Sequence, residues 1–157
     1  MAAQAEILDE LRRLRARLPQ LTGAVAAGRD GLVLAHDAPG VEADGLSALT
    51  ATTLAVAIGM TDATDRGEFR ELLIRGTQGY VATYAAGRHA VLTLLTQDRV
   101  NVGRLHLEGR RAGARIGDLV DAHEAAARET ARPAAVPKES ARTLPTRAVN
   151  ARTTTDS

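Results

Sequence analysis

Histidines are the side chains in this sequence with the widest chemistry, because imidazole binds metal ions and transfers protons near neutral pH. A metal site on one helix needs a second ligand about one turn away, as in the HExxH motif. No carboxylate or second histidine lies four residues from any of the four histidines, which are His36, His89, His106 and His123. The chain has no cysteine, which excludes thiolate sites and thiol catalysis. The sequence therefore predicts no metal site and no cofactor.

Nucleophilic and acid–base groups do not fall into catalytic patterns either. None of the three serines stands in a Gly-x-Ser-x-Gly turn, and no GxxxxGK[ST] phosphate-binding loop is present. Asp62 and Asp65 are three residues apart near a predicted helix end. Such a pair suits acid–base chemistry, but a solvated helix terminus is the commoner explanation. We therefore expect a protein without catalytic residues of its own.

The distribution of charge divides the chain into two parts. The whole sequence of 157 residues carries a net charge of +1. Residues 131–157 contain five basic and two acidic residues, a net charge of +3, so residues 1–130 carry −2. The second part also holds three prolines and almost no large apolar side chain, so its burial cannot offset its ordering entropy. We expect one folded domain over 1–130 and a disordered tail over 131–157.

Two classes of partner are disfavoured by composition. Arginines of the folded part are interleaved with acidic residues, and three aromatics (Phe69, Tyr80 and Tyr84) do not make a base-stacking platform, so nucleic acid is not expected. No apolar run approaches the ~20 residues of a membrane span. The first 17 residues are charged throughout, unlike a signal peptide. We expect a soluble cytoplasmic protein.

Apolar spacing predicts alternating helices and strands over residues 1–130. Ile7, Leu11, Leu14 and Leu18 form one stripe of an amphipathic helix over 4–17, which Pro19 ends. Short apolar runs predict five strands, in a hairpin around Gly28-Arg29-Asp30-Gly31 and a three-stranded meander. These strands are Leu21–Ala27, Leu32–His36, Glu68–Arg75, Gly79–Ala85 and Arg88–Thr96. The remaining helices are Asp44–Thr64, with Asp44 as N-cap, and one that Asn101 caps and that runs to about Thr130.

This order of elements fits a single antiparallel sheet with helices on both faces. In the last helix, the side expected to be buried consists of Leu105, Ala112, Ile116, Leu119 and His123. The opposite side, expected in solvent, consists of Glu108, Arg110, Arg111, Arg115 and Asp118.

The second helix is unusual because it has no charged residue from Gly45 to Thr61, whereas a helix facing water normally has a polar side. A helical projection places the following residues on one side, which we assign to the core: Leu46, Leu49, Thr50, Thr53, Val56, Ala57 and Met60. The opposite side consists of Ala48, Ala51, Thr52, Ala55 and Gly59, with Leu54 and Ile58 on the flank between. Such a small, uncharged side favours close approach by another helix or a flat partner. An alanine-rich side without function is the alternative.

Four segments in this order resemble the Roadblock/LC7 family over about residues 3–125. They are ILDELRRLRARLPQLTGAVAAGRDGLVLAH, the uncharged helix, ELLIRGTQGYVATYAAGRHAVLTLLT and VNVGRLHLEGRRAGARIGDLV. The bacterial branch that regulates Ras-like small GTPases is the most similar. The resemblance implies an α+β sandwich, in which a five-stranded antiparallel sheet has the central helix on one face and the terminal helices on the other.

The resemblance also implies a homodimer joined through the central helix and the Glu68–Arg75 strand, with the paired helices forming a platform for a Ras-like GTPase. The platform residues would be Ala48, Ala51, Thr52, Leu54, Ala55, Ile58 and Gly59, and those of the dimer strand Phe69, Glu71, Leu73 and Arg75. Such regulators need no arginine finger, so none is assigned to Arg66, Arg70 or Arg75. An adaptor that tethers signalling proteins without changing GTPase kinetics and a small-molecule sensor remain the alternatives.

Overall fold

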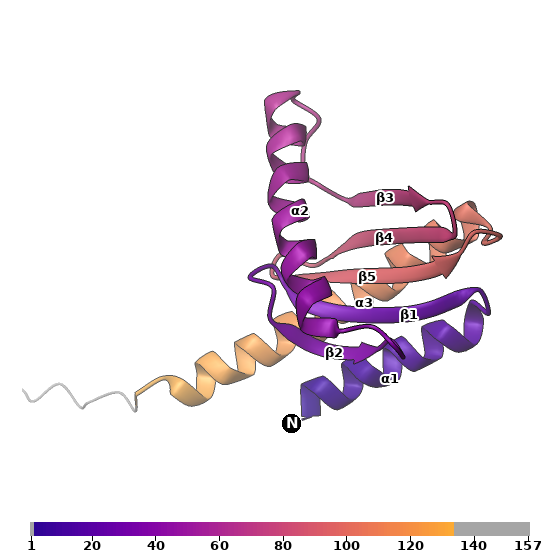
Figure 1. Cartoon of the computed structure of the whole chain (residues 1–157). Helices are drawn as coiled ribbons and strands as arrows, with labels where there is room; N and C mark the ends of the chain where they lie inside the picture. Colours follow the sequence, from indigo (N-terminus) through magenta and orange to yellow (C-terminus); the bar gives the residue numbers. More distant parts are fainter. Residues whose placement is uncertain (1, 134–157) are drawn as a thin grey trace, which may run out of the picture.

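A computed structural model describes residues 2–133 of the chain, which contain three helices and five strands. Most of the expected tail, residues 134–157, lies outside the described residues. Figure 1 shows the elements in chain order, and their bounds are as follows. They are α1 (Ala2–Arg17), β1 (Leu21–Gly28), β2 (Val33–Asp37), α2 (Ala43–Ala63), β3 (Glu71–Gly76), β4 (Gly79–Ala86), β5 (Ala90–Gln97) and α3 (Val102–Ala131).

The five strands form one antiparallel sheet in the order β2-β1-β5-β4-β3, so β2 and β3 are its edges. Helices α1 and α3 lie on one face and α2 crosses the other face near one end of the strands (Figure 1). This arrangement confirms the expected α+β fold. Gly31 has a φ of 87° in the β1–β2 turn, a left-handed conformation that glycine adopts without steric cost.

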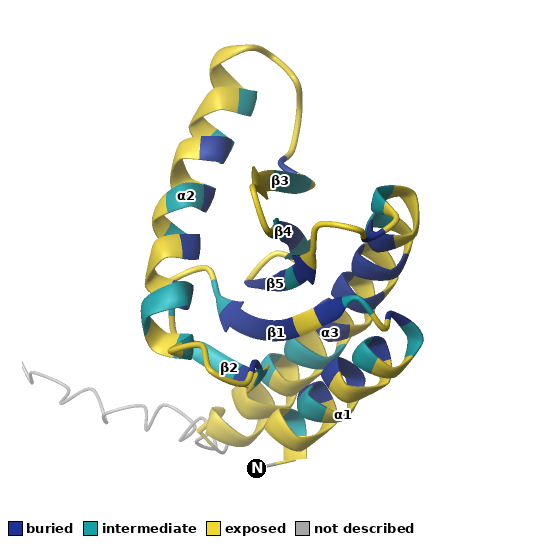
Figure 2. Ribbon diagram, turned by 45° about the vertical axis from the view of Figure 1, so that its right-hand side comes forward, coloured by how far each residue is buried: buried dark blue, intermediate teal, exposed yellow. Residues whose placement is uncertain are grey.

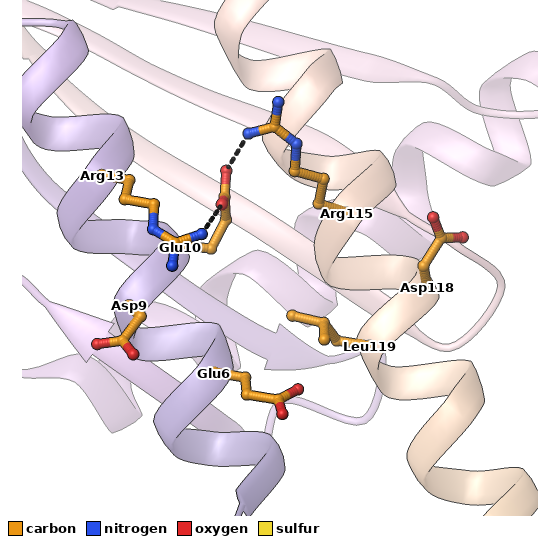
Figure 3. A pocket seen from close by; sticks show the side chains of 7 residues that line it. All are labelled: Glu6, Asp9, Glu10, Arg13, Arg115, Asp118 and Leu119. Atoms are coloured by element: carbon orange, nitrogen blue, oxygen red, sulfur yellow. Dashed lines mark hydrogen bonds and ion pairs between the residues drawn. The ribbon is translucent and has the colours of Figure 1, made fainter.

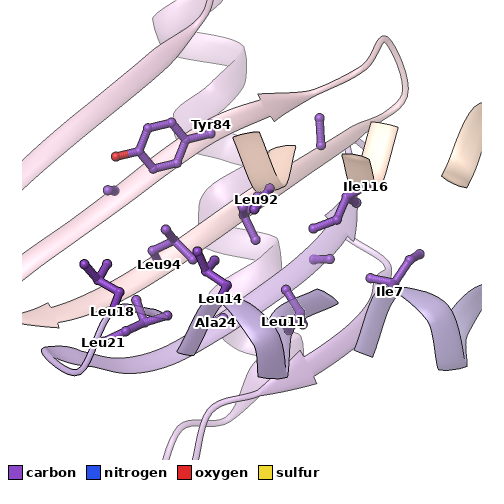
Figure 4. Packing of buried hydrophobic residues seen from close by; sticks show 14 of the residues in the cluster. Ile7, Leu11, Leu14, Leu18, Leu21, Ala24, Tyr84, Leu92, Leu94 and Ile116 are labelled. Carbon is purple, nitrogen blue, oxygen red and sulfur yellow. The ribbon is translucent and has the colours of Figure 1, made fainter. Parts of the chain in front are cut away.

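The main core lies between the sheet and the α1–α3 pair. Figure 4 shows leucines of α1 facing Leu92 and Leu94 of the central strand β5, and all of these side chains are fully buried. Tyr84 of β4 is the largest buried side chain. Its ring occupies the space that a side chain at Gly109 of α3 would need, because a Cβ there would lie 2.5 Å from ring atoms. Leucine, tyrosine and glycine thus give this face dense packing.

The core beneath α2 is smaller and more polar. Its apolar part consists of Ala27, Leu54, Ala57, Phe69 and Val91, with Ile58, Leu72 and Ala85 packed at its edge. Next to it, the hydroxyls of Thr50 and Thr93 form a buried hydrogen bond of 3.2 Å between helix and sheet. The buried hydroxyl of Ser47 has no hydrogen-bond partner among the described residues. The α2 helix is therefore attached by less apolar surface than α1 and α3.

Several sequence-based predictions need correction. Helix α2 begins one residue earlier than predicted, and its N-cap is Glu42 and not Asp44. The Glu42 carboxylate accepts a 2.9 Å hydrogen bond from the Gly45 N–H.

Asn101 caps α3 as predicted, because its side chain accepts a 3.0 Å hydrogen bond from the N–H of Arg104. The two sides of α3 differ from the prediction at two positions. Glu108 is buried because it accepts a hydrogen bond from Arg17, and His123 is exposed.

The expectation that no segment is apolar enough to cross a membrane also needs correction. Helix α2 has 21 residues and an 18-residue window with a mean hydropathy of 1.3, and 22% of that window is buried. Length and composition alone would therefore permit a span. Core helices of soluble proteins meet the same conditions of length and composition, and one side of α2 packs on the sheet.

Candidate interaction surface on α2 and β3

The buried side of α2 differs from the predicted one. The residues that face the sheet are Ser47, Thr50, Leu54 and Ala57. Their spacing of three and four residues is that of one side of a helix. Three large residues assigned to the core lie in solvent instead: Leu49, Val56 and Met60 are 67%, 60% and 66% exposed. Only Thr50 and Ala57 of the predicted core side are buried.

The outer side of α2 is therefore more apolar than predicted. Figure 2 shows exposed positions along this side and buried positions only where the helix meets the sheet. Leu49, Val56 and Met60 are spaced so that they share the outer side, and no charged residue lies between Gly45 and Thr61. Isolated apolar side chains on a surface are common, but a row of them without charges is typical of an interface. We call the exposed residues from Ala48 to Met60 the α2 outer surface.

The predicted platform residues fall into three groups. Ala48, Thr52, Ala55 and Gly59 are exposed and belong to the α2 outer surface. Ala51 and Ile58 are half-buried, and Ala51 lies near Gly31 of the β1–β2 turn. Leu54 is 4% exposed and belongs to the core beneath α2, so its assignment to the platform was wrong. A side chain at Gly59 would meet nothing within 4 Å, which leaves this part of the helix open to a close neighbour.

The edge strand β3 continues the surface with an unpaired edge. It pairs with β4 on one side only, in the register Leu73 to Ala82, and no described strand pairs with its other side. Leu72 packs against the core beneath α2, and Ile74, two residues further on, shares its face and is 46% exposed. An unpaired edge beside exposed apolar side chains is a template for pairing with another chain.

Of the predicted dimer-strand residues, Glu71, Leu73 and Arg75 lie on β3 and Phe69 does not. Phe69 precedes β3 and is buried beneath α2, so it is not an interface residue of the strand. Leu73 is half-buried and packs on the main core. Glu71 points to α3, where Arg110 donates two hydrogen bonds to its carboxylate, and these bonds lower the pKa of Glu71. Arg75 is exposed, with its guanidinium 5.9 Å from the centre of the Tyr80 ring.

A groove between α1 and α3 is lined mainly by charged side chains. Its volume is about 480 Å³, and Figure 3 shows Glu10 between Arg13 and Arg115 at its wall. Glu10 is buried and accepts hydrogen bonds from Arg115 at 3.0 Å and from Arg17 at 3.2 Å. Because Arg17 belongs to α1 and Arg115 to α3, the Glu10 carboxylate joins the two helices.

A second polar pair lies at the main core. The hydroxyl of Tyr84 and Nδ1 of His106 are 2.9 Å apart. Burial raises the pKa of Tyr84 well above its usual value, so its phenol stays protonated near neutral pH. This pair completes the packing of β4 against α3.

The order of the elements and the sheet can be compared with known proteins. A family model described as Roadblock/LC7 domain matches residues 7–96, more than half of the chain. The chain belongs to the Roadblock/LC7 family. An uncharacterized protein of Methanocaldococcus jannaschii is 29% identical over 97 residues, which cover 61% of this chain and 84% of that protein.

Two solved structures show the same Roadblock/LC7 fold. The structure titled MglB with tetrameric arrangement has a TM-score of 0.72 and 24% identity, and the match covers 77% of this chain and 92% of that one. The gliding protein MglB from Thermus thermophilus has a TM-score of 0.70 and 23% identity, with coverage of 77% and 93%. The sheet with helices on both faces is thus an architecture that this domain shares with them.

The outward direction of Leu49, Val56 and Met60 was not predicted from the sequence. The usual rule for a helix of a single chain places its largest apolar side chains in the core. Two contacts with other elements favour the observed side. Gly31 approaches Ala48 and Ala51 closely, and Thr50 finds a hydroxyl partner only on the sheet.

Proposed function

We propose that this Roadblock/LC7 protein is a homodimeric regulator or scaffold of a Ras-like small GTPase in the cytoplasm, without catalytic residues of its own. The observation that carries the proposal is the α2 outer surface, where Leu49, Val56 and Met60 are more than half exposed on a helix segment without charges. The resemblance of the chain to bacterial GTPase regulators of this family supports the class of partner.

Self-association is the first part of the proposal. A two-fold axis beside β3 would pair this edge with the β3 edge of a second copy and bring the two α2 helices together on one face of a continuous sheet. Such an arrangement satisfies the unpaired backbone groups of β3 and covers the apolar side chains of α2. Ala55 and Gly59, which have small or no side chains, would let the helices approach closely.

The GTPase would bind to the platform that the paired α2 helices form. A platform without charges suits a partner recognised by shape and apolar contact, so affinity would depend weakly on salt. We assign no arginine finger. Regulation would act on the conformation of the GTPase.

The test uses the Ras-like GTPase encoded nearest to this gene, loaded with GDP or with a GTP analogue. We expect a complex with one of the two forms and a change in the rate of hydrolysis or of nucleotide exchange. Binding without any change in either rate supports the adaptor alternative. No complex in either form contradicts the proposal.

A matched pair of variants locates the surface. Ala55→Arg places a charge on the α2 outer surface, and Ala125→Arg makes the same change at an exposed position of α3. We expect Ala55→Arg to reduce GTPase binding by at least about tenfold, equal to 1.4 kcal/mol, and Ala125→Arg to leave it unchanged. Equal binding by the two variants contradicts the assignment of the platform to α2.

A further inference from the structure

Three metal-ligand side chains from distant parts of the sequence converge on the side of the sheet opposite α2. His89 lies in the turn between β4 and β5, and Asp121 and Glu124 lie one helical turn apart on α3. Their ligand atoms all lie within 4.8 Å of one another, and His89 Nε2 is 3.8 Å from a carboxylate oxygen of Glu124. All three side chains reach solvent, so an ion has access to them.

The turn that carries His89 is held against α3 by contact between two glycines. A Cβ at Gly117 would lie 2.5 Å from the backbone nitrogen of Gly87, so the turn lies too close to the helix for any side chain at this position. Gly87 has a φ of 67°, which glycine adopts without strain. The carbonyl of His89 accepts a 3.0 Å hydrogen bond from the N–H of Arg29. The backbone of His89 is thus fixed relative to α3.

We propose that His89, Asp121 and Glu124 form a binding site for a Zn²⁺ ion. One imidazole and two carboxylates are ligands that Zn²⁺ accepts, and water fills the fourth position of such a site. Tetrahedral bonds of about 2.0–2.2 Å place ligand atoms about 3.4 Å apart. The observed ligand atoms need to move closer by less than about 1.5 Å to reach that separation. Rotation of exposed side chains between staggered conformations provides such a movement.

Arg128 competes for one ligand. Its guanidinium lies 4.0 Å from the carboxylate of Glu124, one helical turn away. An exposed ion pair of this kind contributes little, so Zn²⁺ displaces it. Removal of the charge by Arg128→Gln is expected to strengthen Zn²⁺ binding, and weaker binding by that variant contradicts the site.

The test is calorimetric titration of Zn²⁺ into the full chain, prepared without a histidine tag and stripped of metal with a chelator. We expect one Zn²⁺ per chain. His89→Ala and Asp121→Asn are each expected to weaken binding by at least about tenfold, since even the loss of an outer-shell partner costs that much. Co²⁺ in place of Zn²⁺ is expected to give the visible absorption of a bound ion in the unmodified chain and not in His89→Ala.

His36→Ala is the matched control, because His36 is also an exposed histidine but lies on β2 at the far edge of the sheet. It is expected to bind Zn²⁺ like the unmodified chain. Circular dichroism checks that each variant is folded. Absence of saturable binding, or binding that His89→Ala leaves unchanged, overturns the proposal.

Discussion

The α1–α3 side of the sheet buries a large, leucine-rich cluster, whereas the α2 side buries a smaller one flanked by the polar side chains of Ser47, Thr50 and Thr93. The two sides also differ in their charged residues. Glu10 and Glu108 are buried among arginines between α1 and α3, while α2 has no charge from Gly45 to Thr61. The α1–α3 side thus buries more apolar side chains within a single chain, whereas three large apolar residues of α2 stay exposed.

A small domain can in this way combine stability with an interface. The α1–α3 side supplies most of the burial that offsets conformational entropy. Helix α2 is then free to present Leu49, Val56 and Met60 outward rather than to the sheet. Substitutions on the two sides should therefore have different consequences, and the following variants test this.

The largest effect is expected in the main core. Leu14→Ala removes a fully buried side chain between α1 and the sheet, and we expect a loss of about 3–5 kcal/mol of unfolding free energy. Leu54→Ala makes the same change beneath α2, where the cluster is small and lies near the surface, and we expect about 2 kcal/mol. Chemical denaturation at one fixed protein concentration measures both. A larger loss for Leu54→Ala contradicts the comparison.

Two glycines give a second contrast between the helices. Gly109→Ala forces the Tyr84 ring, 2.5 Å from the new methyl group, to move within a dense core, and we expect a loss of about 1–3 kcal/mol. Gly59→Ala meets nothing within 4 Å in one chain, so the better helix former is expected to stabilise it by about 0.5–1 kcal/mol. Thermal unfolding measures both, with Gly59→Ala made in a Val56→Arg background to exclude effects of self-association. A stabilising Gly109→Ala would show that α3 packs less tightly than described.

A smaller effect is expected on the pH dependence of stability, through the ion pair of Glu71 on β3 with Arg110 on α3. The hydrogen bonds from Arg110 lower the pKa of Glu71 in the folded state below its usual value of 4.5. The stability that this carboxylate contributes is therefore present above about pH 4.5 and is lost as the pH falls through the lowered folded-state pKa. We expect the stability difference between the unmodified chain and Glu71→Gln to shrink between neutral pH and about pH 3.

Arg110→Met is the control for this pH effect, because it removes the same hydrogen bonds from the other partner. Denaturation curves at several pH values are expected to show that the unfolding free energy of both variants depends less on pH than that of the unmodified chain. A difference between Glu71→Gln and the unmodified chain that stays constant over this range would contradict the role of the pair.

Much of the fold could be predicted from sequence because its signals are local. Pro19 ends the first helix, the Gly28–Gly31 turn joins a hairpin, and the apolar spacing of Ile7, Leu11 and Leu14 gives the buried side of α1. The antiparallel meander follows from short connections between apolar runs. These features depend on a few neighbouring residues each, so one sequence contains them.

The side of α2 that faces the sheet could not be predicted in the same way. Both sides of the helix are apolar, so periodicity does not distinguish them, and the choice depends on Thr93 and Gly31 in other elements. The proposed cluster of His89 with Asp121 and Glu124 depends on the close contact of Gly87 with Gly117, which no spacing in the sequence indicates. The burial of Glu108 could not be predicted from α3 alone either, because its hydrogen-bond partner Arg17 belongs to α1.

The central claim, that the α2 outer surface joins two copies, is tested most directly by multi-angle light scattering of the full chain. We expect the unmodified protein to have twice the chain mass of 16.5 kDa at micromolar concentration. Val56→Arg, at a position 60% exposed in one chain, is expected to have the mass of a single chain. Leu107→Arg, at an exposed position of α3, is expected to remain dimeric. A monomeric unmodified protein, or a Val56→Arg variant that stays dimeric, would contradict the claim.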